Sequence, residues 1–204
     1  MKNKYRDTIK VYDKLGRKYF EATLKVLPKE RAGFMNLLKK GAKILDAGCS
    51  GGRDMKEFVK RGFDAVGIDL SSTLLKIAKQ EVLKGKFFKM DVLDLKFPKE
   101  YFDGIWADAV LLHLERKDIP KVLKGFYRVL KKSGALYVSV KHGRGAKFVR
   151  EKPFTDYMRF YTYFSKTEME EFFKKAGFGI IKSKFLPDDL RRPGVKWVSI
   201  LASK

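Results

Sequence analysis

A glycine-rich segment is the part of the sequence best suited to bind a ligand; it reads Asp46-Ala47-Gly48-Cys49-Ser50-Gly51-Gly52. It follows a short apolar run and precedes a helical pattern, and glycines at such a turn let the backbone approach a ligand closely. A dinucleotide fingerprint that begins at Gly48 would need glycines where the chain has Ser50 and Arg53. The lysine of a P-loop is also missing from its position. The segment is therefore a poor match to a pyrophosphate site.

Charged residues at both ends of this segment favour a ligand with an amino-acid tail. Asp46 is placed to meet an ammonium group and Arg53 to meet a carboxylate, and S-adenosylmethionine carries both groups. Asp69 ends the next apolar run, where an acidic residue accepts hydrogen bonds from ribose hydroxyls. Plainer alternatives exist for the same residues: Asp46 and Asp69 could cap the helices that follow, and Arg53 could be an ordinary surface residue.

Residues after the third and fourth apolar runs extend this site towards an adenine ring. Asp91 is placed to take the exocyclic amine of adenine, with Met90 and Val92 as apolar neighbours of the ring. Cys49 could be a nucleophile, although a small residue that lines the pocket is the preferred interpretation. S-adenosyl-L-methionine is thus the predicted cofactor, and the other candidate contacts to it are Gly48, Ser50, Gly52, Leu70 and Ala107.

The elements that would position these residues alternate between strands and helices. Apolar runs predict strands at 42–46, 63–68, 86–90, 102–106 and 135–140, and two last strands, forming an antiparallel hairpin, at 178–185 and 195–202. Helical spacing predicts helices over 52–61 and 117–131, after the caps Ser71 and Ser165, and within 4–38. This alternation implies parallel strands with helices on both faces, and ligands that bind beyond the carboxyl ends of the strands.

The chain has no internal repeat and no Pro/Gly/Ser-rich linker, so residues 1–204 are expected to form one domain. We divide it into an N-terminal helical cap (1–40), a cofactor-binding core (41–140), a substrate-side loop or lid (141–164), and a C-terminal helix and hairpin (165–204).

Five segments in order resemble the class I S-adenosylmethionine-dependent methyltransferases over about residues 40–140; they are ILDAGCSGGRD, VGIDLS, KMDVLDL, FDGIWADAVLLHL and LKKSGALYVSVK. The resemblance implies an α/β fold, a Rossmann-like, doubly wound sheet of seven strands that is mostly parallel and ends in an antiparallel C-terminal hairpin. It also implies a methyltransferase that works by in-line displacement and leaves S-adenosyl-L-homocysteine.

The Gly-Arg-Asp sequence at 52–54 is similar to a bacterial and archaeal branch of this family whose substrates are mostly unassigned. In that branch an N-terminal helix with tyrosines closes over the cofactor, and Tyr12 and Tyr19 are the matching positions here. The chain departs from the family at Ser50, where glycine is usual. We expect serine to be tolerated there because it is small.

Candidate catalytic and acceptor-binding residues lie further along the chain. His113 follows the fourth predicted strand; the resemblance implies that it lines the cofactor pocket, and histidine also suits a general base. His142, after the fifth strand, is a second candidate base. Arg144, Arg159 and Tyr161 are candidate substrate contacts in the basic and aromatic segment 141–164, a composition that suits either stacked bases or a lid over a small acidic or aromatic substrate.

The net charge of +22 is concentrated in the two ends of the chain and favours an anionic partner, with a lysine-rich thermophilic surface as the alternative. The fourth segment lacks the Asn/Asp-Pro-Pro-aromatic sequence used on the exocyclic amines of nucleic-acid bases. We therefore expect a small-molecule acceptor first and RNA second, and a non-catalytic cofactor-binding or regulatory subunit is the remaining alternative.

Other composition features exclude several classes of protein. With two histidines and one cysteine, we expect no metal site. No apolar run is long enough to span a membrane and no signal peptide is visible, so we expect a cytoplasmic protein without a membrane partner. The sequence carries no prediction of the oligomeric state.

Overall fold

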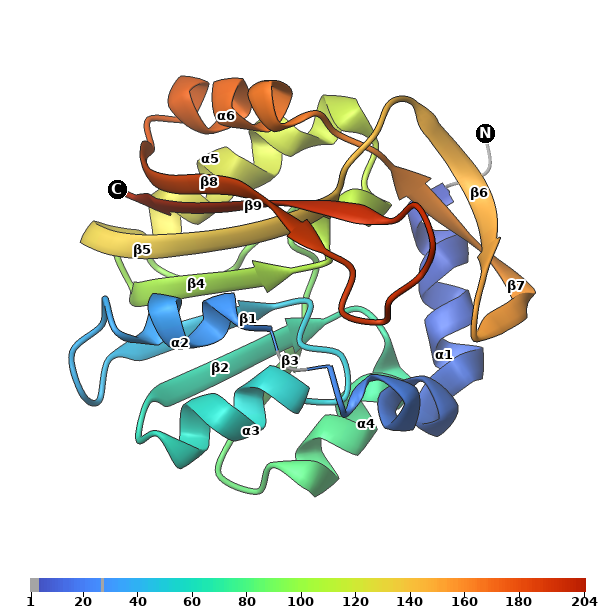
Figure 1. The fold of residues 1–204 in the computed structure, drawn as a ribbon. Helices are drawn as coiled ribbons and strands as arrows, with labels where there is room; N and C mark the ends of the chain where they lie inside the picture. Colours follow the sequence, from blue (N-terminus) through green and yellow to red (C-terminus); the bar gives the residue numbers. More distant parts are fainter. Residues whose placement is uncertain (1–3, 27) are drawn as a thin grey trace.

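A seven-stranded sheet in the order β3-β2-β1-β4-β5-β9-β8 forms the centre of the computed structural model, which describes residues 4–26 and 28–204 (Figure 1). The strands β1 to β5 are parallel, whereas β9 lies antiparallel to both β5 and β8. The doubly wound sheet with an antiparallel C-terminal hairpin is thus confirmed. Its strands are β1 (Lys43–Ala47), β2 (Asp64–Asp69), β3 (Lys86–Lys89), β4 (Phe102–Asp108), β5 (Leu130–Lys141), β8 (Gly179–Pro187) and β9 (Lys196–Ser203).

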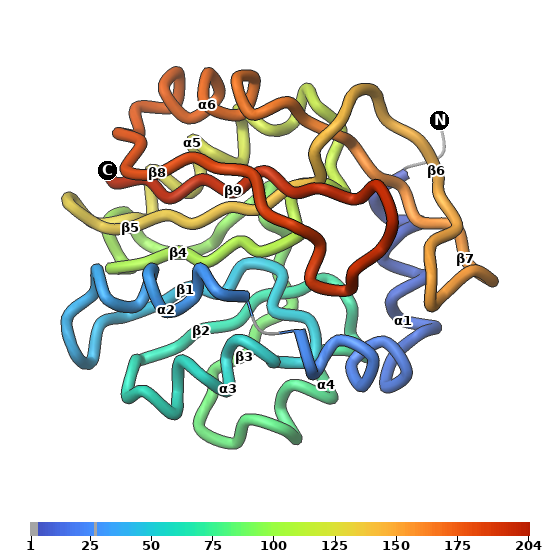
Figure 2. The backbone as a smooth tube through the Cα atoms, in the orientation of Figure 1, coloured from blue at the N-terminus to red at the C-terminus, as the bar shows by residue number. Residues whose placement is uncertain are grey.

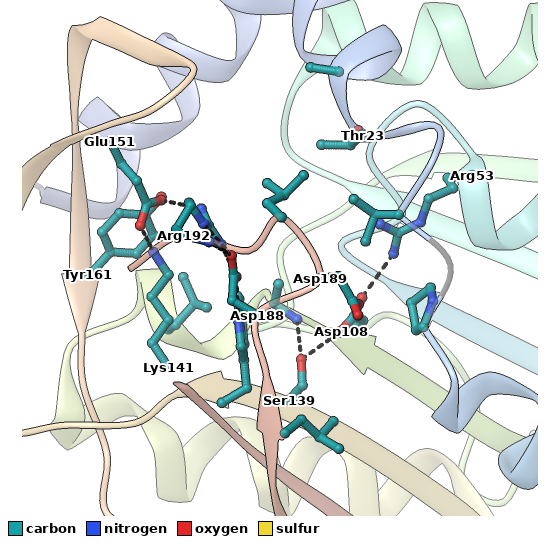
Figure 3. Close-up of a pocket in the computed structure, with 18 of the residues that line it drawn as sticks. Thr23, Arg53, Asp108, Ser139, Lys141, Glu151, Tyr161, Asp188, Asp189 and Arg192 are labelled. Carbon is teal, nitrogen blue, oxygen red and sulfur yellow. Dashed lines mark hydrogen bonds and ion pairs between the residues drawn. The ribbon is translucent and has the colours of Figure 1, made fainter. Parts of the chain in front are cut away.

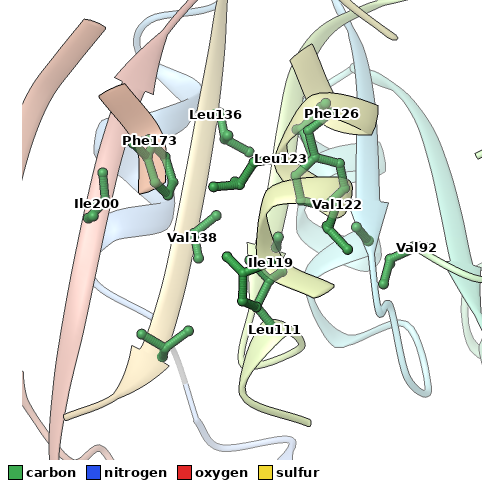
Figure 4. Packing of buried hydrophobic residues seen from close by; sticks show 14 of the residues in the cluster. Val92, Leu111, Ile119, Val122, Leu123, Phe126, Leu136, Val138, Phe173 and Ile200 are labelled. Carbon is green, nitrogen blue, oxygen red and sulfur yellow. The ribbon is translucent and has the colours of Figure 1, made fainter. Parts of the chain in front are cut away.

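Helices cover both faces of this sheet. One face packs against α5 (Ile119–Val129) and α6 (Lys166–Lys175), as Figure 4 shows for Phe126 and Phe173. The other face packs against α2 (Glu30–Met35), α3 (Arg53–Lys60) and α4 (Ser72–Glu81). Neighbouring residues along a strand point to opposite faces, so Leu45 belongs to the first cluster and Ile44 to the second.

The N-terminal helix stands at the end of the sheet towards which the arrows of β2 and β4 point (Figure 1). It is α1 (Lys4–Thr23), with a kink at Gly16, and it packs through Tyr12 and Phe20 against Leu74 and Ile77, which belong to α4. The helical pattern predicted within 4–38 therefore forms two helices, α1 and α2. In this way α1 covers the edge where the parallel strands present their carboxyl ends.

Residues 141–164 were predicted as a substrate-side loop or lid; the loop is wrong, and the role of a lid stays a prediction. The segment contains a separate two-stranded antiparallel sheet, β6 (Ala146–Glu151) and β7 (Phe154–Thr162). Its aromatic and β-branched residues favour strands. The hairpin packs on α1, where the backbone N–H of Phe160 donates to Thr8 Oγ1 across 2.9 Å.

Most of the other predicted elements lie within a few residues of the observed ones. The helix predicted over 117–131 is shorter: a 3₁₀ turn, η2 (Arg116–Asp118), precedes α5, and the chain enters β5 at Leu130. Ser71 and Ser165 cap α4 and α6 as predicted, since their side chains accept hydrogen bonds from the backbone of Leu74 and Glu168.

The loop between β8 and β9 reaches the same end of the sheet as α1 and the hairpin, as the tube in Figure 2 shows. A second short turn, η1 (Leu111–His113), follows β4 at this end. The helix α1, the β6–β7 hairpin and the loop between β8 and β9, which are distant in sequence, thus surround the carboxyl edge of the sheet. Within the part of the chain that the structure describes, no helix is both long and apolar enough to cross a membrane.

Replacement of Phe126 by alanine tests the core under α5. Phe126 has no exposed surface, so Phe126→Ala should lower the free energy of unfolding by about 3–5 kcal/mol, measured by urea unfolding. Leu83→Ala is the control, because Leu83 is 88% exposed and its loss should change the value by less than about 0.5 kcal/mol. Similar losses in both variants would contradict the packing described.

Candidate active site

A cavity of about 60 Å³ lies at the carboxyl ends of β1, β2 and β3, under α1. Tyr5, which the sequence analysis missed, lines it, and its hydroxyl donates to Asp91 Oδ1 across 3.5 Å. Asp91 is half-buried, and the backbone N–H of Leu93 donates to it as well. Most of the predicted cofactor residues line the same cavity: Tyr12, Tyr19, Gly48, Ser50, Asp69, Leu70, Met90, Val92 and His113.

The loop after β1 has a conformation that its sequence explains. Gly48 has a φ of 80°, and a Cβ atom there would lie 2.8 Å from the side chain of Val110. Ser50 has a φ of 51°, in the left-handed region that glycine adopts most easily, which accounts for the glycine usual at this place in the resembling family. Asp69 holds the loop, because its carboxylate accepts the backbone N–H of Ser50 (2.9 Å) and of Ser71 (2.8 Å).

Asp46 has the property expected of a residue that awaits a cationic partner. It is 3% exposed, and among the residues described its Oδ2 is one of the buried side-chain polar atoms without a hydrogen-bond partner. Burial, together with the nearby Asp54 carboxylate, raises the pKa of Asp46 well above its usual range. An ammonium group would satisfy this oxygen and favour the charged form. The donor set therefore fits S-adenosylmethionine.

Five predicted cofactor contacts do not line either cavity described here: Asp46, Cys49, Gly52, Asp91 and Ala107. Cys49 is buried and packs over Gly67, because a Cβ atom added to Gly67 would lie 2.8 Å from Cys49 Sγ. Gly52 begins α3 with a φ of 87° and lies against Ala78, so glycine is needed there for the packing of α3 on α4. Ala107 points into the core under α5. Their neighbours in the fold account for the small side chains of Cys49, Gly52 and Ala107, and contact with the cofactor stays a prediction for these residues.

Arg53 lies in a network of buried charges at the start of α3. Its Nη2 donates to Asp54 Oδ2 (2.5 Å) and to Asp108 Oδ2 (2.9 Å), while Arg31 Nη1 donates to Asp54 Oδ1 (2.5 Å). Although burial opposes it, the charges of Arg53 and Arg31 hold the pKa of Asp54 below its usual range. Asp54 thus positions Arg53, whose side chain points into a second cavity (Figure 3).

This second cavity has a volume of about 170 Å³ and adjoins the first. It is enclosed by α1, the ends of β4 and β5, the β6–β7 hairpin and the loop between β8 and β9. The two cavities have four wall residues in common, Tyr12, Tyr19, Ala109 and His113. A ligand in one cavity therefore lies next to a ligand in the other.

His113 is engaged at both ring nitrogens. Its Nδ1 lies 2.9 Å from the carbonyl oxygen of Phe160, which only accepts, so Nδ1 carries the proton. Its Nε2 then accepts from the hydroxyl of Tyr12, at 2.8 Å. Burial lowers the pKa of His113 to about 3. These observations fit a wall residue that orients Tyr12 and disfavour the role of general base.

The structure separates the candidate residues around 141–164 into two groups. Arg159 and Tyr161 are buried and line the larger cavity, as predicted for substrate contacts. His142 lies outside the residues that line either cavity and packs against Phe185, and Arg144 is exposed on the turn before β6. The expected placement of His142 and Arg144 at the pocket is therefore wrong.

Strand alternation explains this outcome. Successive side chains of β5 point to opposite faces, so Ser139 and Lys141 enter the cavity where His142 was expected. Period-two counting from the buried strand would have selected Ser139 and Lys141. Glu151, Asp188 and Arg192 were also missed, and they carry no local motif. Within residues 4–26 and 28–204, no group of three or more His, Cys, Asp or Glu could hold a metal ion.

Comparison with known proteins agrees with a Rossmann-like enzyme that binds a nucleoside-containing cofactor. Residues 44–134 match the family described as Methyltransferase domain. A phosphoethanolamine N-methyltransferase 1 of Zea mays is 35% identical over 107 residues, 50% of this chain and 21% of the relative. A phosphoethanolamine N-methyltransferase of Plasmodium falciparum is 29% identical over 199 residues, 91% of this chain and 72% of the relative.

Solved structures have the same fold. A 1,6-didemethyltoxoflavin-N1-methyltransferase of Burkholderia thailandensis, with bound 1,6-didemethyltoxoflavin and S-adenosylhomocysteine, superimposes with a TM-score of 0.76 at 21% identity. The match covers 96% of this chain and 86% of that one. Residues 44–134 thus match a methyltransferase domain, and the fold is that of class I S-adenosylmethionine-dependent methyltransferases. The chain spans only about a fifth of the plant relatives, so their activity does not transfer with the match.

Replacement of Ser50 tests the backbone requirement of the loop. Ser50→Gly should raise the free energy of unfolding by about 0.5–1 kcal/mol, because glycine adopts the φ of 51° with less strain. Ser50→Val should lower the value, since a β-branched residue resists this conformation. Urea unfolding of wild type and the two variants measures their free energies of unfolding, which should rise in the order Val, Ser, Gly. A Val variant as stable as the Gly variant would contradict the geometry.

Buried neutral His113 makes stability depend on pH. Its pKa is about 3 when folded, and about 6.5 in an unfolded chain, so the unfolded state binds more protons between these values and stability falls as the pH drops. Between pH 7 and 5, wild type should lose about 2 kcal/mol more unfolding free energy than His113→Asn. Urea unfolding at both pH values measures this, and equal losses would rule out the buried neutral ring.

Proposed function

We propose that the protein transfers a methyl group from S-adenosylmethionine to a small-molecule acceptor held in the larger cavity. The observation that carries this proposal is the cavity of about 170 Å³ that adjoins the smaller cavity through four residues that line both. A wall in common lets a methyl group and an acceptor atom meet without water between them. The enclosure by α1, the hairpin and the β8–β9 loop favours a compact acceptor over a polymer.

Residues that line the smaller cavity, together with Asp46 and Arg53 near it, suit the parts of the cofactor. Asp69 stands at the end of β2, where its carboxylate would meet ribose hydroxyls, and Met90 and Val92 offer apolar contacts to an adenine ring. Asp46 would hold the ammonium group through its unpartnered Oδ2. Arg53 would hold the carboxylate, since its guanidinium faces the larger cavity beside the wall that the two cavities have in common.

The chemistry asks little of the protein beyond alignment. S-adenosylmethionine supplies a methyl group that its positive sulfur already activates. Tyr12, oriented by His113, and Tyr19 close the site from α1 and exclude water. Asp108 accepts hydrogen bonds from Ser139 Oγ (2.5 Å) and from Arg53, which hold its carboxylate in place. Because Asp108 lines the larger cavity, an acceptor that loses a proton would approach it there. In-line displacement needs no catalytic triad.

Two relatives act on small acceptors by their names, phosphoethanolamine and 1,6-didemethyltoxoflavin, which supports this class of acceptor. RNA remains the second candidate because the chain carries a net charge of +22. Transfer of labelled methyl groups to a panel of small amines, phenols and acids, run beside total RNA, separates the two. Labelling of RNA alone would overturn the small-molecule proposal.

Calorimetric titration with S-adenosylmethionine tests the cofactor site. Wild type should bind, and Asp69→Ala should bind at least about tenfold more weakly, because it loses charge-assisted hydrogen bonds to the ribose. Asp94→Ala is the matched control: Asp94 is an exposed carboxylate three residues after Asp91, and its loss should leave binding unchanged. Circular dichroism checks that each variant is folded.

Absence of binding by folded wild-type protein would overturn the proposed function. Binding without methyl transfer to any acceptor of the panel would favour a non-catalytic cofactor-binding subunit instead. Equal binding by wild type and Asp69→Ala would remove Asp69 from the site.

A further inference from the structure

Three basic side chains converge on one carboxylate inside the larger cavity, and Figure 3 shows two of them, Lys141 and Arg192, at Glu151. Glu151, at the end of β6, forms ion pairs with Lys141, with Arg192 Nη1 (2.7 Å) and with Arg159 Nη2 (3.5 Å). The exposed fractions of the Lys141 and Arg159 side chains are only 3% and 4%. The group is therefore shielded from water, and charge interactions are stronger in the protein interior than in water.

Positive charge is in excess in this group. Arg192 also pairs with Asp188, at 2.5 Å, and Trp197 Nε1 donates to Asp188 across 2.9 Å. Three cations thus face two carboxylates. Burial of the side chain lowers the pKa of Lys141 to about 8, against the opposing charge of Glu151. One further anion would balance the group.

Arg159 is the least satisfied member of the group. Its Nε is buried and has no hydrogen-bond partner among the residues that the structure describes. The hydrogen bond to Tyr12 Oη and the ion pair to Glu151 Oε2 are both long, at 3.5 Å. The rings of Phe154 and Tyr161 lie 5.6 Å from the guanidinium and hold it without accepting its N–H groups. A buried guanidinium with such weak partners is costly unless an anion meets it.

We propose that Arg159, with Lys141 and Arg192, binds an anionic group of the acceptor, a carboxylate or a phosphate, and that Glu151 occupies this place until the acceptor displaces it. This inference rests on the proposed function and names the chemistry of its acceptor. Glu151 stands beside the turn between β6 and β7, and its displacement would release the three cations and the hydroxyl of Tyr161, which donates to Glu151 Oε2 across 3.1 Å.

The position of Arg159 also limits the size of the acceptor. Arg159 Nη1 lies 3.5 Å from Tyr12 Oη, and Tyr12 belongs to the wall between the two cavities. An anion on Arg159 is therefore next to the place where methyl transfer would occur. The acceptor atom and the anionic group must be separated by only a few bonds.

Anion titration of the full chain tests this proposal. Inorganic phosphate and acetate are titrated calorimetrically at constant ionic strength, with chloride as the balancing salt, in the absence and in the presence of S-adenosylhomocysteine. Wild type should bind one of the two anions with a stoichiometry near one. The tighter of the two identifies the group as phosphate or carboxylate.

Variants with opposite expected effects make the test specific. Arg159→Gln should weaken binding about 10- to 100-fold, because it removes charged hydrogen bonds. Glu151→Gln should strengthen binding about tenfold, because it removes the internal competitor and leaves the cations. Arg144→Gln is the matched control: it removes the same charge from an exposed position outside the residues that line either cavity, and should leave binding unchanged.

Two results would overturn the proposal: no anion binding by wild type, or unchanged or weaker binding in Glu151→Gln. Equal weakening in Arg144→Gln and Arg159→Gln would also overturn it, since it would show a general effect of charge. If Arg159→Gln does not fold, Arg159→Lys replaces it and should bind more weakly than wild type. The titration with S-adenosylmethionine is independent: cofactor binding without anion binding rejects this inference alone, and loss of cofactor binding rejects the proposed function.

Discussion

The hydrogen bond from the Tyr12 hydroxyl to His113 Nε2, 2.8 Å long, joins the segments on which both cavities depend. Tyr12 comes from α1 and His113 from the turn after β4, and the other nitrogen of His113 meets the carbonyl of Phe160 in β7. One neutral imidazole therefore connects the helical cap, the edge of the sheet and the hairpin. Together with the packing of α1 on α4 and the hydrogen bond between Phe160 and Thr8, it fixes the wall between the cavities.

Buried charge gives the two cavities their different characters. Near the smaller cavity, the buried Asp46 lies beside the Asp54 carboxylate and keeps an oxygen without a hydrogen-bond partner. In the larger cavity, three cations surround Glu151, and Arg159 keeps an Nε without a partner among the described residues. Groups of this kind cost stability in a low-dielectric interior. Their position around two adjoining cavities is explained if ligands of opposite charge complete them.

The cofactor half of the site could be predicted because its residues follow strands directly. In a parallel sheet the carboxyl ends meet at one edge, so Asp69 after β2 and Met90 after β3 must lie close together. Small residues were harder to interpret. Gly52 and Cys49 look like ligand contacts in a glycine-rich loop, but helix packing and strand packing also require small side chains, and only the fold shows that packing requirement. The predicted placement of His142 at the pocket was wrong for a simpler reason. His142 follows Lys141 at the end of β5, and a shift of one residue along a strand moves a side chain to the opposite face.

The fold class, the edge of the sheet where the cofactor is expected and the resemblance to a family could all be inferred from the sequence, because they depend on local patterns: strand and helix periods and the residues that follow each strand. The larger cavity emerges only in the folded chain. Lys141, Glu151 and Arg192 come from β5, the hairpin and the β8–β9 loop, and no spacing in the chain relates them. Their meeting depends on how the hairpin and the loop pack across the end of the sheet, which is set by long-range contacts that no local pattern encodes.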